Sequence, residues 1–413
     1  MVDDDHNISA VVEKNFDKKE IKDTVIRIAK TPAPQTEMYE REPLVLDAVL
    51  NMYRPIFEEA GCETWIDDYG NLIATHGEGN PGKKNVVLLG YAMHWTEGTM
   101  KNPWSGEVMD GARFGVEGEV VWGRGGSEYT GSNTAIINCA RTVHKSGIKI
   151  PGRITYIISS AGHTSSSDPV FHLIHNDQIK GDFCIQPGRP DITLGNTGRL
   201  DLKLLVYGKS VHSGGELSAG INAIEGGLIA IDRLKKIMPF PPKGKNDPDM
   251  GRGRLSIIGL ASYPPSPGFH RGLGSGGHTL QNLMRILLDR RLVPGEEDAN
   301  AAIEEIKQAV GDLSPWKTTY ERGAFQLPVK HSKDSPLIRG LSESYEAMIH
   351  RPPKYIYVNE TIDAGFMTSL GIPTVMYGTF DMRFAHGDTD ICQLNYVYDA
   401  SKVYTHWAIK TAQ

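Results

Sequence analysis

The chain is organised around the stretch Trp122-Gly123-Arg124-Gly125-Gly126-Ser127-Glu128-Tyr129-Thr130-Gly131. An apolar alternation precedes it at 119–122, and a helical pattern follows from Asn133. Its glycines allow a sharp turn in which the backbone approaches a ligand closely. Glu128 is the one acidic side chain of the stretch, so a loop at a strand end would present a single carboxylate there.

Length and composition limit the class of protein. The 413 residues suffice for two domains, and 39% apolar with 23% charged residues is the composition of a soluble globular protein. The net charge of −6 argues against a partner that is nucleic acid or an anionic membrane. Four scattered cysteines without a CxxC pair, and the lack of a long apolar run, predict a cytoplasmic protein with no membrane-spanning segment.

Strands and helices alternate through the first half of the chain. A continuous apolar run at 85–90 predicts a central buried strand, and 153–158 and 183–185 predict further strands. Helical spacing occurs at 42–60 and 132–146. This order predicts an α/β fold with a mixed, mainly parallel sheet, helices on both faces, and a ligand site at the carboxyl ends of the strands.

The pattern changes near Gly198, where half-exposed strands replace buried ones. We expect a strand–helix–strand–strand–helix–strand order, which is typical of a small α+β domain inserted in a larger one. The predicted domains are a catalytic domain formed by 1–197 and 324–413, and an inserted domain at 198–323.

Several short motifs occur in a fixed order along nearly the whole chain. They are Leu88-Leu89-Gly90, Trp122-Gly123-Arg124-Gly125, Gly208-Lys209-Ser210-Val211-His212-Ser213, Asp289-Arg290-Arg291, Thr361-Ile362-Asp363-Ala364, Gly371-Ile372-Pro373-Thr374 and Ala385-His386. This series resembles the co-catalytic zinc aminohydrolases, such as aminoacylase, acetylornithine deacetylase, succinyl-diaminopimelate desuccinylase and the glutamate-type carboxypeptidases. The resemblance implies a zinc-peptidase-like catalytic domain and an inserted lid domain through which two copies form a homodimer.

The resemblance also implies a two-zinc site, but most of its ligand positions are changed. Tyr91 and Met93 stand where the family has a His and an Asp. Ser159 and Ser160 stand in place of the catalytic glutamate and its neighbouring ligand, and Gln186 replaces an acidic ligand. Tyr, Ser and Gln are weak zinc ligands beside His and carboxylate. We therefore expect the binuclear site to be absent and no cofactor to be required.

Two ligand positions keep a suitable side chain, because Glu128 replaces the bridging Asp and His386 matches the last His. A carboxylate and an imidazole form a sufficient acid/base pair for a metal-independent enzyme. Ser159 or Ser160 beside a His would be a nucleophile, and Tyr91 would hydrogen-bond a carbonyl or oxyanion. A buried aromatic that fills the space of a lost metal is the other interpretation of Tyr91.

Four further residues are predicted to bind substrate. Gln186 lies in the same predicted pocket, and His212 would reach it from the lid domain. Arg291, and at a spacing one residue off Asn282, resemble family residues that contact a substrate carboxylate. The substrate would be a small polar molecule with an amide-like or C–N bond.

Three alternatives remain open from the sequence. A relocated single zinc or manganese ion would be held by His94, Glu128, His163 and His386, which form a chemically suitable ligand set. The same residues would also suit a metal-free lyase, isomerase or decarboxylase. The third alternative is a non-catalytic binding protein on the peptidase fold.

Overall fold

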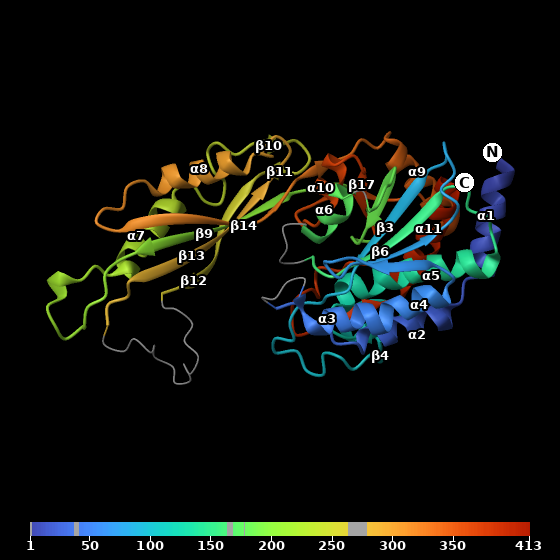
Figure 1. The fold of residues 1–413 in the computed structure, drawn as a ribbon, viewed down its shortest axis with the longest axis horizontal. Helices are drawn as coiled ribbons and strands as arrows, with labels where there is room; N and C mark the ends of the chain where they lie inside the picture. The colour runs from blue at the N-terminus through green and yellow to red at the C-terminus, as the bar shows by residue number, and fades with distance from the viewer. Residues whose placement is uncertain (1, 37–40, 163–167, 177, 263–278) are drawn as a thin grey trace. The chain divides into compact units, whose positions relative to one another are not determined.

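The chain folds into two units in the computed structural model, which describes residues 2–36, 41–162, 168–176, 178–262 and 279–413 (Figure 1). Unit 1 comprises Met1–Gly195, Lys330–Tyr357 and Ile362–Gln413. Unit 2 comprises Asn196–Val329 and Val358–Thr361.

Unit 1 is built on a sheet of nine strands in the order β1-β2-β6-β3-β7-β17-β8-β15, with β16 paired to β8. The centre of the sheet, from β6 through β3 and β7 to β17, is parallel, whereas β1, β2 and β8 pair antiparallel. The strands are β1 (Glu63–Ile66), β2 (Leu72–His76), β3 (Asn85–Tyr91), β6 (Arg153–Ser159), β7 (Phe183–Gln186), β8 (Ile192–Asn196), β15 (Val329–Lys330), β16 (Tyr355–Val358) and β17 (Thr374–Met376). This arrangement confirms the predicted α/β class.

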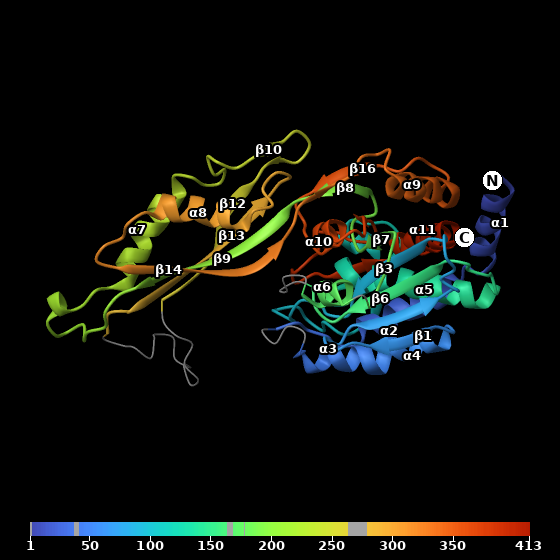
Figure 2. The same ribbon diagram turned by 45° about the horizontal axis from the view of Figure 1, so that its top comes forward.

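The apolar run of β3 explains its central place in the sheet. Its side chains from Val86 to Leu89 are fully buried, as a strand covered on both faces requires. Helices α5 and α11 both pack against β3 and β6 (Figures 1 and 2). The helices of unit 1 are α1 (Val2–Lys14), α2 (Lys18–Ala29), α3 (Pro43–Ala48), α4 (Arg54–Glu59), α5 (Gly131–Ser146), α6 (Asp168–His175), α9 (Pro336–Ile349), α10 (Ala364–Ser369) and α11 (Leu394–Ala412).

A small antiparallel sheet brings two distant segments of unit 1 together. Strand β5 (Glu119–Trp122) pairs with β4 (Glu107–Asp110) on one side and with β18 (Ile391–Gln393) on the other. Since the glycine-rich stretch follows β5 and the loop of His386 precedes β18, this pairing places the two loops side by side.

Unit 2 has a four-stranded antiparallel sheet in the order β12-β13-β9-β14. Alternate side chains of β9 and β13 are buried beneath α7 and α8, which explains the half-exposed pattern of these strands. The elements are β9 (Gly198–Tyr207), α7 (Ala223–Lys235), β12 (Arg254–Ala261), β13 (Leu283–Leu292), α8 (Ala299–Val310) and β14 (Lys317–Gln326), with the short hairpin β10 (Asn246–Asp247) and β11 (Gly251–Arg252). Among the described residues of both units, no helix has the length and apolar character needed to cross a bilayer.

Candidate active site

Glu128 and His386 form a direct pair in unit 1. Glu128 lies in the π-helical turn Gly126–Thr130 that leads into α5, and its side chain is buried. His386 Nε2 lies 3.3 Å from Glu128 Oε1, and the His386 side chain is 39% exposed. The pair therefore joins a buried carboxylate to an imidazole that solvent or a ligand can reach.

The environment favours the charged form of His386. Burial alone would lower its pKa, but the hydrogen bond and the negative charge of Glu128 more than offset this and raise the pKa above its ordinary value. Asp390 acts in the same direction as Glu128, and Arg124 acts against it. The imidazole is therefore a stronger base than an ordinary histidine.

Trp95 completes the surroundings of His386. The two rings stack with centroids 4.5 Å apart and planes 10° from parallel. Trp95 lies in the loop after β3, whereas His386 adopts a left-handed backbone conformation with φ of 62°, which is uncommon for a residue with a side chain. Trp95 was not among the predicted site residues.

Tyr91 lies at the end of β3 and is fully buried. Its hydroxyl donates a 2.5 Å hydrogen bond to Asp363 Oδ2, and its ring lies 4.9 Å from that of Tyr129. Burial, and next the charge of Asp363, raise the Tyr91 pKa well above its usual range, so the phenol stays protonated. Because its proton points to Asp363, this geometry favours the buried-aromatic interpretation of Tyr91 over the predicted oxyanion donor.

Asp363 was not among the predicted site residues. It lies directly before α10 and is 1% exposed. Its motif, Thr361-Ile362-Asp363-Ala364, was part of the family resemblance, but its contact with Tyr91 spans 272 positions of sequence. Only the fold reveals that pairing.

Ser159, which ends β6, and Ser160, which follows it, are also fully buried. Ser159 Oγ donates to the carbonyl of Ala161 at 3.2 Å, and Ser160 Oγ donates to the carbonyl of Tyr69 at 2.6 Å. These partners are carbonyls rather than a histidine that could accept the hydroxyl proton. The geometry therefore does not support the predicted nucleophile role for either serine.

Gln186 ends β7 and is fully buried, yet neither polar atom of its amide has a hydrogen-bond partner among the described residues. Val87 of β3 pairs with Cys184 of β7. Since alternate side chains of a strand point to the same face, Tyr91 shares the face of Val87 and Gln186 shares that of Cys184, so the two lie on one face of the sheet. A buried amide in this state is typical of a group that binds a ligand or an ordered water.

Among the described residues of the relocated-metal hypothesis, His94, Glu128 and His386 do not form a group that could hold a metal ion. His94 is buried against the backbone of Gly125, where an added Cβ would lie 2.1 Å from His94 Nδ1. His163 lies outside the described residues.

The remaining predicted residues belong to unit 2. His212 is exposed, and its Nδ1 accepts a hydrogen bond from the backbone of Gly214. Arg291 is held by both oxygens of Asp289 at 2.8 Å and by the carbonyl of Asn359. Asn282 is exposed beside these strands. In this arrangement Arg291 makes the strand ion pair that competes with its predicted role in substrate binding.

The side chains at the family's ligand positions do not fit a pair of zinc ions. A zinc site needs about four His, Cys or carboxylate donors at roughly 2 Å from the metal. Within the described ranges, no group of three or more His, Cys, Asp or Glu residues could hold a metal ion. The ligand positions instead hold buried Tyr, Met, Ser and Gln side chains, of which the Tyr and both Ser hydroxyls are already hydrogen-bonded.

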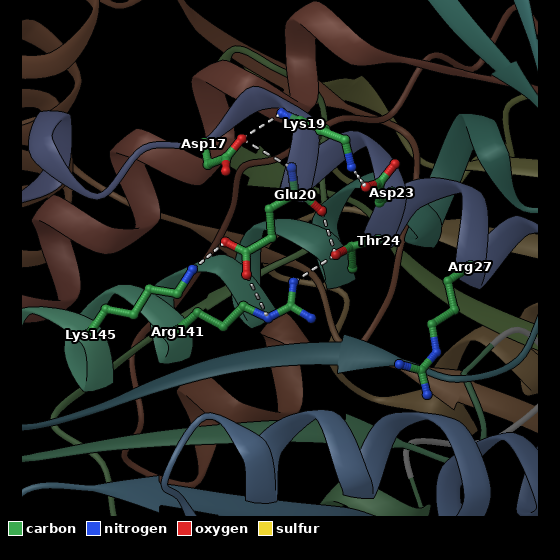
Figure 3. Close-up of a pocket in the computed structure, with 8 residues that line it drawn as sticks. All are labelled: Asp17, Lys19, Glu20, Asp23, Thr24, Arg27, Arg141 and Lys145. Atoms are coloured by element: carbon green, nitrogen blue, oxygen red, sulfur yellow. Dashed lines mark hydrogen bonds and ion pairs between the residues drawn. The ribbon is translucent and has the colours of Figure 1, made fainter.

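A charged hollow of about 320 Å³ lies elsewhere on unit 1, on the outer side of α2 and α5 (Figure 3). It is lined by Asp17, Lys19, Glu20, Asp23, Thr24, Arg27, Arg141 and Lys145. None of these is a candidate site residue. Figure 3 shows Glu20 between Lys145 and Arg141, so the hollow is lined by the ion pairs that join the two helices.

The fold and the Glu128–His386 pair define an α/β protein with a candidate acid/base site. Residues 93–410 match peptidase family M20/M25/M40, which is most of the chain, and the protein belongs to this family. The match confirms the predicted resemblance and the predicted enzyme class, a hydrolase acting on C–N bonds. Members of this family are normally zinc-dependent.

Known relatives cover most or all of the chain. Succinyl-diaminopimelate desuccinylase of Xanthomonas campestris pv. campestris (strain 8004) is 25% identical over 361 residues, which span 78% of this chain and 85% of the relative. A di-peptidase of Saccharomyces cerevisiae has a TM-score of 0.75 at 12% identity, covering 100% of this chain and 99% of its own. Human carnosine dipeptidase 1 has a TM-score of 0.72 at 15% identity, covering 99% and 100%. At such identities the two solved structures establish the fold.

Proposed function

We propose that this protein hydrolyses the C–N bond of a small, polar, amide-like molecule without the family's two zinc ions, using Glu128 and His386 as the acid/base pair. The observation that carries the proposal is the 3.3 Å contact between Glu128 Oε1 and His386 Nε2, one group buried and the other accessible. The names of the relatives, a desuccinylase and dipeptidases, support an amide-like substrate.

The pair suits both proton transfers of amide hydrolysis. Neutral His386 would take a proton from a water molecule as the water oxygen bonds to the carbonyl carbon. The imidazolium, stabilised by Glu128, would then give that proton to the leaving nitrogen as the C–N bond breaks. Over the two steps one water is consumed, and an acid and an amine are released.

Gln186 is the best candidate for binding the amide group of the substrate. Its buried amide carries an NH2 group that could donate to a carbonyl and a carbonyl oxygen that could accept from an N–H. We expect Gln186→Leu to raise KM more than it lowers kcat, because the amide would bind ground state and transition state alike. A fall in kcat at unchanged KM would contradict that role.

The decisive experiment combines metal analysis with a substrate screen. Protein purified without added metal is assayed for amine release from N-acyl amino acids and dipeptides, before and after chelation. We expect turnover that survives chelation and that Glu128→Gln and His386→Gln lower by at least about 100-fold. The control is Glu305→Gln, which changes a buried glutamate of unit 2 and should leave the rate unchanged.

Two outcomes of the metal analysis would replace the proposal. Activity lost on chelation and restored by zinc would mean that the protein is a metal enzyme. One tightly held ion per chain, lost in His163→Ala, would favour the relocated site of His94, Glu128, His163 and His386.

We further propose that two copies associate through unit 2. Strand β12 is an edge strand of the described sheet, and Ile258 and Leu260 on it are 59% and 55% exposed. Exposed apolar side chains on an edge strand favour pairing with a second chain, and a second copy offers the same edge in a twofold arrangement.

Light scattering at micromolar concentration tests this association. We expect a dimer for the natural chain and a monomer for the double variant Ile258→Lys, Leu260→Lys. Leu370→Lys, at an exposed leucine of unit 1, should remain dimeric. A monomeric natural chain would end the proposal.

A further inference from the structure

We infer that Arg124 and Asp390, a buried ion pair behind the candidate site, are positioning residues that hold three separate loops in the arrangement in which Trp95, Glu128 and His386 meet. The arrangement itself is independent of catalysis. Its importance for turnover rests on the proposed function.

Asp390 shapes the loop that carries Glu128. Its Oδ2 accepts the backbone N–H of Gly125 at 2.8 Å, and its Oδ1 accepts that of Ser127 at 2.8 Å. Both carboxylate oxygens therefore accept backbone N–H groups from residues that lie within three positions of Glu128. Asp390 is fully buried and comes directly before β18, so the small sheet fixes it in place.

The turn held by Asp390 requires its glycine. Gly125 has a left-handed backbone with φ of 83°, and a Cβ on it would lie 2.1 Å from Nδ1 of His94. The chain can therefore present the Gly125 N–H to Asp390 only without a side chain at this position.

Arg124 connects the same turn to the other two loops. Its Nη1 donates to the carbonyl of Gly387 at 2.8 Å, next to His386, and lies 3.3 Å from Asp390 Oδ2. Its Nη2 donates to the carbonyl of Glu97 at 2.8 Å, two residues after Trp95. The guanidinium is 1% exposed, so these are interactions shielded from water.

Only a planar, forked group can make these contacts at once. Arginine presents its donors in a fixed plane, whereas the lysine ammonium is a single point on a flexible chain. The three loops come from distant parts of the sequence, so without such a connection their relative positions would depend on loop conformation alone. A shift of about 1 Å in an active site is enough to impair catalysis.

The stacking of Trp95 on His386 allows this positioning to be measured directly by NMR. A ring stacked on an indole has its carbon-bound protons shifted upfield in the NMR spectrum by the ring current. Protein labelled with carbon-13 only in histidine shows the ring protons of its 14 histidines, and the loss of one signal in His386→Gln assigns His386. Trp95→Leu gives the position of that signal without the stack.

We expect Arg124→Met and Asp390→Asn each to move the His386 signal most of the way to its position in Trp95→Leu. Asp390→Asn keeps the size of the side chain but replaces one acceptor oxygen with a donor that faces a backbone N–H. Arg124→Lys, which keeps the charge, should also move the signal, and it serves in place of Arg124→Met if that variant does not fold.

The matched control is Arg290→Met in unit 2. Arg290 is equally buried and pairs with Glu296, so its loss destabilises the protein without touching these loops. An unmoved His386 signal in folded Asp390→Asn and Arg124→Lys would overturn the inference, as would an equal movement in Arg290→Met. Because the measurement needs no substrate, its failure is distinct from a failure of the proposed function, which Glu128→Gln tests.

Discussion

At the scale of single residues, the site is defined by the side chains at the predicted metal-ligand positions. Tyr91, which the resemblance places at the position of a family histidine, is a buried ring whose hydroxyl is hydrogen-bonded to Asp363. Gln186 keeps the approximate shape of an acidic ligand but has no charge. Neutral side chains thus stand at the ligand positions that the resemblance predicts, while Glu128 and His386 form an ionisable pair.

Removing the Tyr91 hydroxyl should destabilise the fold. In Tyr91→Phe the buried carboxylate of Asp363 loses the phenol as a donor, which we expect to lower the free energy of unfolding by about 1–3 kcal/mol. Urea denaturation measures the change, and Tyr207→Phe, at a partly exposed tyrosine of unit 2, should have almost no effect. Equal losses in the two variants would contradict the importance of the Tyr91–Asp363 bond.

The Glu128–His386 pair should make stability depend on pH in a defined direction. Since the folded pKa of His386 is raised above its unfolded value, the stabilisation is fully present below the unfolded pKa, about 6.5. It is lost as the pH rises through the folded pKa. The stability difference between the natural chain and His386→Gln should therefore shrink as the pH rises above about 6.5.

Solvent limits the size of that effect. The His386 side chain is 39% exposed, so we expect the pair to contribute no more than about 1 kcal/mol. Urea unfolding of both proteins across the pH range measures it. A difference that grows with pH would mean that the pair is not ionic in the folded protein.

At the scale of helices and strands, α2 and α5 are joined by a small charge network (Figure 3). Glu20 accepts Lys145 Nζ at 2.6 Å and lies 3.7 Å from Arg141 Nε, while Arg141 Nη1 donates to Thr24 Oγ1. We expect Glu20→Gln to cost about 0.5–1 kcal/mol of unfolding free energy, less at high salt. The control Asp23→Asn breaks only the exposed pair with Lys19 inside α2 and should change stability by less. A larger loss of stability in Asp23→Asn than in Glu20→Gln would contradict the importance of the network.

Hydrophobic periodicity predicted the elements well because each pattern is local. The apolar run at 85–90 became the buried β3, and the alternation at 200–206 became part of β9, with one face beneath α7 and α8. The predicted helix at 42–60 contains a π-helical turn at Val49–Tyr53 between α3 and α4. That turn keeps the same apolar face buried, so periodicity cannot detect it.

The site could be predicted only in part. The glycines around Glu128 predicted its loop, and the motif Ala385-His386 predicted His386, because both signals lie next to the residue concerned. The partners Trp95 and Asp363 were missed, since each meets its neighbour across hundreds of positions through the folded sheet. The contacts of Arg124 are equally non-local, which is why its buried carbonyl partners have no signature in the sequence.

At the scale of the whole molecule, the two units should unfold separately, because each has its own core. Removing one partner of a buried ion pair costs about 3–5 kcal/mol. We therefore expect Arg124→Met to lower the transition of unit 1 and Arg290→Met that of unit 2, as measured by scanning calorimetry. If each variant lowered every transition equally, the chain would be a single cooperative unit.

Family membership and the proposed loss of the metal ligands are compatible at this scale. The match extends over residues 93–410, and it depends on the cores, turns and glycines that make the fold. Catalytic identity depends on a handful of side chains at strand ends, which can change without altering that scaffold.

Apart from Val358–Thr361, unit 2 is one continuous insertion in the chain of unit 1, which makes that insertion a removable module. The chain leaves unit 1 after β8 and returns at β15, which are neighbours in the sheet, and the His331 N–H donates to the carbonyl of Leu194 at 2.7 Å. The departing and returning strands thus already form one end of a hairpin. A short turn in place of 197–328 would close the sheet, and the same junction would accept a foreign domain whose own ends lie close together.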